Sequence, residues 1–288
     1  MKNLLRTLVY NGQVSLTLAD TTALVAEGVR LHGLSDTSAY LFGKALSAMT
    51  FMSACLKGDA GEISLSLKTD GVGGEIAVSG NRALAMRGYI ENTTLSGAYN
   101  QETERAAFAD NGSLTVIRND GYARPFVGAC AFPAVGGLDE AFEEYFRISE
   151  QLPTRIATTV KIGENGKILF AGVAVLQPLP FADENTLQKT NAVDLDGILC
   201  KIKEQGVERA AESSFDKDEQ VWETRTAQYK CNCSRQYLTR VLVSLGEEQM
   251  RAIIREDGAV RIHCHYCNTD YAFGETDADE IFKKQTNK

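Results

Sequence analysis

The sequence contains no uninterrupted run of eighteen apolar residues, so we expect no membrane-spanning helix. Its first residues, MKNLLRTLVYNGQ, hold a short apolar run before Asn11 and Gly12 and lack the hydrophobic region and cleavage site of a secretory signal. An excess of positive charge is also missing, because 30 Lys and Arg residues stand against 38 Asp and Glu residues. The net charge of -8 disfavours extensive binding to nucleic acid or to an anionic membrane. We therefore expect a cytoplasmic protein.

The phosphate-binding pattern GxxxxGK[ST] is absent, so the glycines of TDGVGG (69–74) are expected to form a turn. Cysteine is unevenly spread, since four of the seven lie in YKCNCSRQYL and RIHCHYCNTDY near the C-terminal end. The cytoplasm keeps thiols reduced, and such a cluster there favours a metal or redox site over permanent disulfides. A length of 288 residues leaves room for about two domains. The 44% hydrophobic and 24% charged content indicates a globular protein with a sizeable core.

Residues 1–178 are expected to form one α/β domain. The segment 13–18 alternates like a short strand, whereas 37–56 is apolar at helical spacing and too long for a strand. The second pattern predicts a helix buried against a sheet. Alternating apolar residues in EISLSLKTDGVGGEIAVSG, ALAMRGYI and GSLTVIRND predict the strands of an antiparallel or mixed sheet.

Residues 179–229 are expected to be a helical linker, because Pro178 and Pro180 mark a change in composition. Eleven acidic and seven basic residues occur among the 48 residues from 183 to 230. Its sparse apolar residues are Val193, Leu195, Ile198, Leu199, Ile202, Val207, Phe215, Val221 and Trp222. Amphipathic helices here are expected to bury little and to be marginally stable. Composition favours a solvated linker over a segment poised to unfold, and both interpretations stay open.

Residues 230–288 are expected to form a small C-terminal unit, which completes an α+β protein. Ser234 is placed to cap a helix with an apolar face of Leu238, Val241, Leu242 and Leu245. A second helix carries Met250, Ile253 and Ile254. AVRIHCHYC and DYAF predict a hairpin with the CxxC at its turn, and Asp277 with Glu280 has capping-box spacing for a last helix. So small a core usually needs a metal or disulfides to hold it.

The four clustered cysteines are Cys231, Cys233, Cys264 and Cys267. In an extended chain residues i and i+2 point to the same side, so the CxC sulfurs can both face one ion. A CxxC at a tight turn directs both of its sulfurs inward. Four thiolates at about 2.3 Å suit Zn²⁺, and such a closed site is structural rather than hydrolytic. The spacing therefore predicts one zinc ion held by four sulfurs.

Two histidines, His263 and His265, flank Cys264 and are rival ligands. On a strand they would point to the face opposite Cys264, so we expect them at the surface and prefer four sulfurs to a mixed set. The remaining cysteines have no partner spacing and are expected to be small buried hydrophobes; they are Cys55, Cys130 and Cys200.

Zinc holds its thiol ligands as thiolates, which are the oxidisable form of cysteine. A peroxide would convert a thiolate to a sulfenic acid and then to a disulfide with the neighbouring thiol. Because the binding energy of the metal is also folding energy, loss of zinc would unfold the small unit. The same residues can thus be structural under reducing conditions and a sensor under oxidising ones, and spacing alone does not establish the second role.

The segment YKCNCSRQYLTRVLVSLGEEQMRAIIREDGAVRIHCHYCNTDYAF closely resembles the C-terminal zinc domain of the heat-shock protein 33 family, the redox-regulated holdase chaperones. The CxC pair, the spacer with SLG and EDG, and the CxxCNxxYxF segment all match. Upstream, LKTDGVGGEIAVSGNRALAMRGYI, GSLTVIRND and YFRISEQLPT resemble the core of that family, and QPLPFADE resembles the entry to its linker. One departure is TDGVGG, where members often carry Gly-Asp-Gly-Pro, and Thr69 and Val72 alter this turn.

This resemblance implies a chaperone, not an enzyme, that is inactive when reduced and zinc-bound. It implies that Cys231, Cys233, Cys264 and Cys267 are both the zinc ligands and the redox-active residues. On oxidation Cys231 would pair with Cys233 and Cys264 with Cys267, zinc would leave, the linker would unfold and the protein would form a homodimer. It would then bind unfolding proteins without ATP during oxidative or heat stress, and hand them to ATP-dependent foldase chaperones.

Three other functions fit parts of the sequence. A nucleic-acid-binding zinc module is disfavoured, because residues 231–288 hold nine acidic and eight basic residues and no basic stripe. A dithiol oxidoreductase could use the CxxC, but such enzymes usually set it at a helix N-terminus without a second cysteine pair. A chaperone that acts independently of its thiols is compatible with the expected fold.

Overall fold

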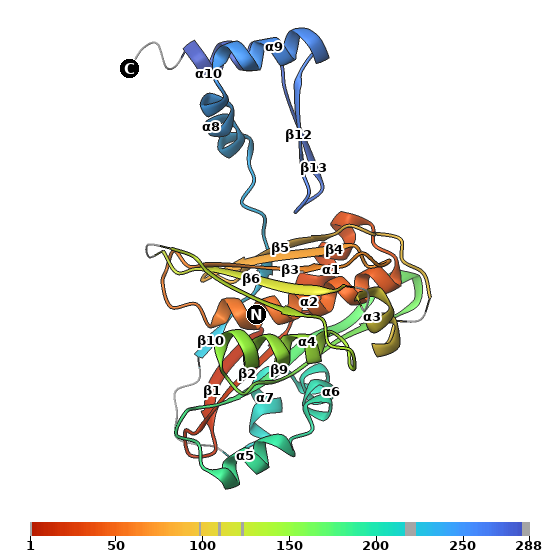
Figure 1. The fold of residues 1–288 in the computed structure, drawn as a ribbon, viewed down its shortest axis with the longest axis vertical. Helices are drawn as coiled ribbons and strands as arrows, with labels where there is room; N and C mark the ends of the chain where they lie inside the picture. The colour runs from red at the N-terminus through yellow and green to blue at the C-terminus, as the bar shows by residue number, and fades with distance from the viewer. Residues whose placement is uncertain (1, 98, 109–110, 122–123, 217–222, 284–288) are drawn as a thin grey trace. The chain divides into compact units, whose positions relative to one another are not determined.

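The computed structural model of the protein describes residues 2–97, 99–108, 111–121, 124–216 and 223–283. Backbone contacts divide the chain into two units, residues 1–230 and 231–288. Both units combine helices and strands, which confirms the α+β class (Figure 1). The residues expected to form a linker, 179–229, belong to the first unit in this structure. None of the described helices is long and apolar enough to cross a membrane.

Two sheets form the frame of the first unit. One contains β1 (Leu4–Val9), β2 (Val14–Asp20), β8 (Arg155–Ile162), β9 (Ile168–Pro178) and β10 (Glu223–Arg225). The other contains β3 (Glu62–Lys68), β4 (Glu75–Asn81), β5 (Ala85–Ile90), β6 (Ser113–Asn119), β7 (Phe126–Ala131) and β11 (Gln228–Tyr229). Their orders are β10-β1-β2-β9-β8 and β11-β5-β4-β3-β6-β7. The pairings are antiparallel except for β11 on β5, so the expected antiparallel or mixed sheet is confirmed.

The helix α2 (Asp36–Ala54) lies between the two sheets and packs against strands of both (Figure 1). All of its residues except Asp36 and Tyr40 are buried. A helix that is buried around its whole circumference needs partners on every side, and the two sheets with α1 (Thr22–His32) provide them. Small residues permit this close packing, since a Cβ added at Gly43 would lie 2.8 Å from Val160 of β8. The expected buried helix is confirmed.

Two shorter helices close the space between the sheets, and they are α3 (Gln101–Phe108) and α4 (Leu138–Tyr145). A π-helical turn at Phe146–Glu150 continues α4, and a 3₁₀ turn at Glu164–Gly166 joins β8 to β9. Helix α4 packs on β7 and β8, so it connects one strand of each sheet.

The segment after β9 forms α5 (Glu184–Asn191), α6 (Leu195–Gln205) and α7 (Val207–Glu212), and α6 and α7 cover the outer face of the five-stranded sheet. Alternation in this sheet gives it two apolar faces, with Leu4 in the core against α2 and Leu5 in the core against α6 and α7. The linker residues buried in the second core are Leu195, Ile198, Leu199, Ile202, Val207, Ala210, Ala211 and Phe215.

The expectation that this segment buries little was therefore wrong. Its few apolar residues share one helical face, and the sheet offers them a second apolar face that local composition does not reveal. Val221 and Trp222, the other two apolar residues named for this segment, lie outside the described residues.

The second unit contains α8 (Arg235–Leu245), α9 (Glu247–Asp257), the hairpin β12 (Val260–Cys264) and β13 (Thr269–Phe273), and α10 (Glu275–Lys283). As expected, Ser234 caps α8 by accepting a hydrogen bond from the backbone N–H of Tyr237 at 3.0 Å. The core of this unit consists of Leu238, Leu242, Met250, Ile254, Val260, Phe273, Ala278 and Phe282.

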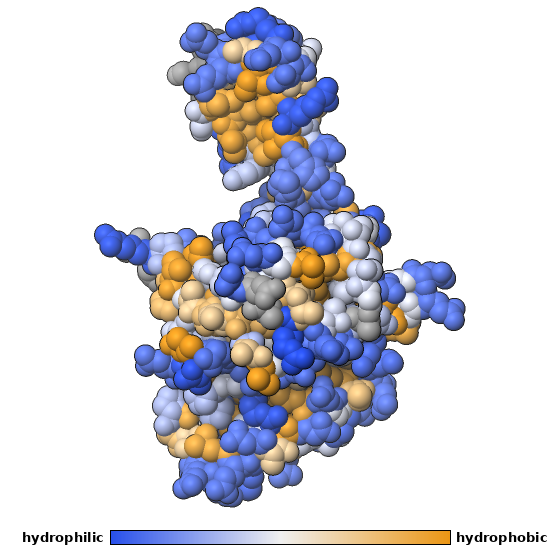
Figure 2. All heavy atoms as spheres, turned by 45° about the vertical axis from the view of Figure 1, so that its right-hand side comes forward, coloured by the Kyte–Doolittle hydropathy of each residue, from blue (hydrophilic) through white to orange (hydrophobic). Residues whose placement is uncertain are grey.

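The apolar face expected for α8 is buried in part. Leu238 and Leu242 enter the core, whereas Val241 and Leu245 are 47% and 37% exposed. The two pairs form neighbouring i, i+4 stripes, and the small core has room for one of them. Apolar residues are visible at the surface of this unit on the face drawn in Figure 2.

A buried ion cluster joins α2, α3, α4 and β8 of the first unit. The Lys44 ammonium lies 2.7 Å from Glu104 and 3.2 Å from Asp139, and the Tyr40 hydroxyl donates to Glu104 at 2.6 Å. Asp139 also accepts hydrogen bonds from the backbone and hydroxyl of Thr158. Burial acts to lower the pKa of Lys44, but Asp139 and Glu104 outweigh it and raise that pKa, so the lysine is charged.

Replacing Lys44 with Met would leave two carboxylates in the core without their cationic partner. We expect the Lys44→Met protein to lose about 3–5 kcal/mol of unfolding free energy, measured by urea denaturation and circular dichroism. The matched control is Lys161→Met, because Lys161 is exposed on β8. It should stay within about 0.5 kcal/mol of the unaltered protein. Equal losses in the two variants would contradict the bridging role of Lys44.

Candidate metal centre

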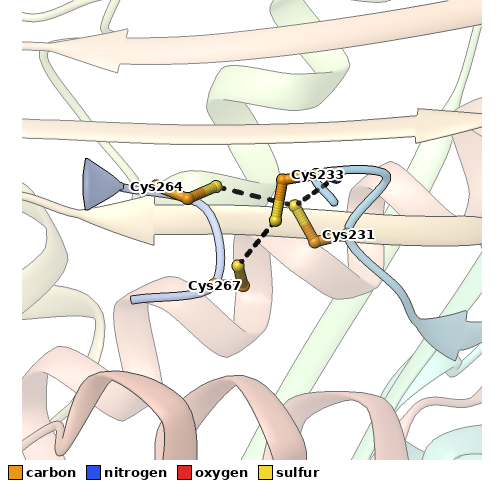
Figure 3. Close-up of side chains that lie close together, drawn as sticks. All are labelled: Cys231, Cys233, Cys264 and Cys267. Carbon is orange, nitrogen blue, oxygen red and sulfur yellow. Dashed lines mark hydrogen bonds between the residues drawn. The ribbon is translucent and has the colours of Figure 1, made fainter. Parts of the chain in front are cut away.

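Four cysteine side chains come together in the second unit. Cys231 and Cys233 lie in the extended segment before α8, Cys264 ends β12, and Cys267 lies in the turn that follows. Their Sγ atoms all lie within 4.8 Å of one another (Figure 3). The structure thus brings together the four cysteines that the CxC and CxxC spacing singled out.

The hairpin turn places the CxxC pair. The backbone N–H groups of Cys267 and Asn268 donate to the carbonyl of Cys264 at 3.3 and 2.8 Å, which closes a tight turn between β12 and β13. Asn268 adopts a positive φ of 54°, a conformation that asparagine tolerates better than most residues. Cys264 pairs with Thr269 in the ladder, so the turn begins directly at the first cysteine.

The shortest sulfur contacts connect the two segments. Cys231 Sγ lies 3.7 Å from Cys264 Sγ, and Cys233 Sγ lies 3.1 Å from Cys267 Sγ. Each contact joins the segment before α8 to the hairpin turn (Figure 3). The cluster therefore closes the second unit across the thirty residues that separate the pairs.

The proximity of the thiols perturbs their acidity. Burial, together with the nearby Cys264, raises the pKa of Cys231 well above its ordinary value, and burial raises the pKa of Cys267 to about 11. Burial also acts to raise the pKa of Cys233, but hydrogen bonds from the Tyr271 hydroxyl and the neighbouring thiols outweigh it and lower that pKa. Four sulfurs so close together resist joint ionisation, and a divalent cation among them would remove this penalty. The donor set therefore fits a thiophilic metal ion.

Two hydroxyl groups touch the sulfurs, and neither was identified from the sequence. The Tyr271 hydroxyl lies 3.3 Å from Cys233 Sγ, and the Cys267 thiol donates to Thr269 Oγ1 at 3.3 Å. Residues 269 and 271 share one face of β13, so alternation from the CxxC could have found them. Groups of this kind orient metal ligands and tune them.

The two histidines lie outside the cluster. His263 and His265 are exposed, and His263 Nδ1 lies 2.8 Å from Asp270 Oδ1 across the hairpin. Their rings contact each other edge to face at 5.0 Å. The position of His263 agrees with the alternation of β12, whereas His265 lies in the turn after that strand.

The three isolated cysteines occupy different environments. Cys130 is buried and Cys55 is half-buried, as expected for small apolar residues, but Cys200 is exposed. The expectation was wrong for Cys200 because α6 turns Ile198, Leu199 and Ile202 toward the sheet and leaves position 200 outside that face.

Comparison with known proteins gives one consistent result. The family described as Hsp33 protein matches residues 2–274. A 33 kDa chaperonin from Clostridium perfringens is 30% identical over 290 residues, covering 98% of this chain and 92% of that protein. One from Geobacillus kaustophilus is 33% identical and covers 96% of each chain. The crystal structure of the 33 kDa chaperonin (heat shock protein 33 homolog) from Thermotoga maritima shares the fold, with a TM-score of 0.82 at 21% identity over 100% of this chain and 99% of that one. The chain therefore belongs to the Hsp33 family, which is a family of chaperones and not of enzymes.

Proposed function

We propose that this protein is a redox-regulated holdase, which binds unfolding proteins without ATP, and that the four-cysteine cluster is its switch. Membership of a chaperone family supports the binding of unfolded clients. The convergence of four Sγ atoms within 4.8 Å supports the switch, because it makes one small unit depend on the state of its thiols.

Zn²⁺ is the ion that we assign to this cluster, since a closed set of four cysteine sulfurs suits it best. Cys231, Cys233, Cys264 and Cys267 would hold the ion, which would keep their sulfurs as thiolates and contribute to folding. Eight buried residues form the apolar core of the second unit, and a core of this size leaves its fold dependent on the cluster.

Oxidation would begin when one thiolate sulfur donates an electron pair to a peroxide oxygen, giving a sulfenic acid and hydroxide. The neighbouring thiolate would then attack that sulfur and form a disulfide, and the sulfenic oxygen would leave as a second hydroxide. Each disulfide thus consumes two thiolates and one hydrogen peroxide, and the two hydroxides take up protons from solvent to become water. We propose the pairs Cys231–Cys233 and Cys264–Cys267. These are the pairs of neighbouring thiols within the CxC and CxxC segments, as the family implies, and all four sulfurs lie within 4.8 Å of one another.

With these pairings no disulfide would join the segment before α8 to the hairpin turn. The second unit would then lose the connection between these two segments that the cluster provides. We propose that residues 179–229 then leave the first unit and uncover the outer face of the five-stranded sheet. That face carries Leu5, Val14, Leu16, Leu18 and Leu176, all buried in the described structure. A contiguous apolar surface of this kind fits an unfolding client.

The proposal assigns three functional parts. Residues 1–178 bind clients and mediate homodimerisation of the oxidised protein, residues 179–229 are a metastable linker, and residues 230–288 are the switch. We further propose that the protein acts in the cytoplasm and hands its clients to ATP-dependent foldase chaperones.

The reduced protein is expected to bind one zinc ion per chain through its cysteines. Cys233→Ser and Cys264→Ser each remove one sulfur, and either protein should contain less than half of that zinc, as measured by mass spectrometry of the metal. The control is the double variant His263→Asn and His265→Asn, which should keep the full amount because both side chains lie outside the cluster. Loss of zinc in the histidine variant would contradict the four-sulfur assignment.

Hydrogen peroxide is expected to remove four thiols per chain together with the zinc and to activate the protein. Light scattering of a thermally aggregating client should fall with the oxidised protein and stay high with the reduced one. Peptide mapping should find Cys231 joined to Cys233 and Cys264 joined to Cys267. Re-reduction with dithiothreitol and zinc serves as the control and should restore the inactive state. Equal scattering in the presence of the two forms would refute a redox switch.

Weaker packing of the linker should lower the amount of oxidant needed for activation. The side chain of Leu199 is 2% exposed. Its truncation in Leu199→Ala should lower the unfolding free energy by about 2–5 kcal/mol. The peroxide concentration for half-maximal suppression of client aggregation should fall accordingly. Cys200→Ala is the matched control on the next residue of the same helix, and because Cys200 is exposed its response should equal that of the unaltered protein. A shift in the control alone would assign the sensitivity to Cys200 instead.

A further inference from the structure

The eight residues directly before Cys231 are residues 223–230, and we call this segment the strap. It pairs with an edge strand of each sheet of the first unit. Its first part, β10, pairs antiparallel with β1, and its second part, β11, pairs parallel with β5. Asn3 reinforces the first pairing, since its backbone N–H donates to Arg225 O at 3.0 Å. The side-chain amide of Asn3 also makes two hydrogen bonds with the backbone of Ala227. It donates to the carbonyl at 3.1 Å and accepts from the N–H at 2.8 Å.

The second pairing is made by main-chain groups. Gln228 N–H donates to Leu84 O at 3.0 Å, and Lys230 N–H donates to Met86 O at 2.7 Å. Such hydrogen bonds do not depend on which side chains the added strand carries. If the strap left, β1 and β5 would become the outermost strands of their sheets, with unpaired backbone groups along them.

One side chain of the strap fills a specific socket. The Tyr229 hydroxyl donates to Gly88 O at 2.9 Å, accepts from Gly88 N–H at 3.2 Å, and lies 3.2 Å from His32 Nε2. Its ring packs on Gly28, where an added Cβ would lie 3.0 Å from the ring and 2.8 Å from Phe42. The socket therefore accepts a flat aromatic ring and offers polar partners to a phenolic oxygen.

We propose that the β1 and β5 edges and the Tyr229 socket form a docking site for extended segments of unfolding clients, and that the strap occupies this site in the reduced protein. The proposal rests on the proposed function, because the oxidation proposed there would allow the strap to leave the first unit. The strap itself shows what fits: an extended backbone with an aromatic side chain.

The chemistry of the site matches an unfolded client. Main-chain pairing gives affinity without a sequence requirement, as when a peptide adds a strand to a sheet edge. Folded proteins pair their own backbone groups, so a free extended segment marks an unfolded chain. The socket adds a preference for aromatic residues, which folded proteins largely bury.

The opposite edge of the six-stranded sheet is an alternative client site, against which the β5 edge can be compared. Strand β7 ends this sheet on the opposite side, pairs with β6, and has no second partner strand among the described residues. It carries exposed Phe126 and Val127, so apolar exposure alone would direct clients there. The two edges can be compared directly, because Ala85 on β5 and Ala129 on β7 are residues of the same type.

The test places a small diazirine amino acid at Ala85 or at Ala129 of the full-length protein and irradiates it with a chemically unfolded client. Cross-links from position 85 should be weak in the reduced protein and rise several-fold after peroxide treatment. Cross-links from position 129 should change little. Equal cross-linking at 85 in both states, or a rise confined to 129, would overturn the edge site. If oxidised protein still suppresses client aggregation in that case, the proposed holdase function stands without it.

A second variant tests the site without oxidation. Tyr229→Ala removes the anchor of the strap and leaves the socket intact, so the amides of Gln228 and Lys230 should exchange with deuterium several-fold faster in the reduced protein. Position 85 should then cross-link the client before any oxidant is added. Tyr229→Phe keeps the ring and should show a smaller effect. Rapid exchange in Tyr229→Ala without client cross-linking would overturn the proposal, even if the oxidised protein proved inactive as a chaperone.

Discussion

The convergence of four thiols brings together the two segments of the second unit that carry them. Sulfurs within 4.8 Å of one another cannot all ionise at low cost unless a cation lies among them. One cysteine pair lies in an extended segment and the other in a hairpin turn. Besides the sulfur cluster, the small apolar core of this unit holds its elements together. The cluster thus links the segment before α8 to the hairpin turn through contacts between cysteine side chains.

The segment that directly precedes this cluster belongs to the first unit. The backbone N–H of Lys230 donates a hydrogen bond to the carbonyl of Met86 on β5, and Lys230 directly precedes Cys231 in the sequence. Earlier in the chain, α6 and α7 cover a sheet face that would otherwise expose leucine and valine side chains. The covering segment is rich in charge, and its apolar residues are buried against that face of the sheet. The sheet thus has two apolar faces, and a segment with a charged outer surface covers one of them.

Much of this arrangement follows from local patterns in the sequence. Alternation predicts β3, β4, β5 and β6, continuous apolarity predicts α2, and the CxC and CxxC spacing predicts the sulfur cluster. Patterns fail where the outcome depends on a distant partner. The burial of Leu199 needs the outer face of a sheet built from residues far away, and the exposure of Val241 reflects the limited size of a core. Strands β10 and β11 are too short to alternate, and the hydroxyl of Tyr271 matters through a fold that brings it to Cys233.

The strand pairings of the first unit differ in length, and therefore in the free energy needed to break them. Strand β3 pairs with both neighbours through seven residues each, and the Lys44 cluster joins three helices and a strand inside the core. Strand β10 pairs with β1 through three residues, and β11 with β5 through two. Local opening follows such differences, because short edge pairings cost less to break than long central ones. In this chain the short pairings lie just before the thiol cluster in the sequence, and the long ones lie in the core, so the first unit is expected to open locally at the short pairings while its core stays folded.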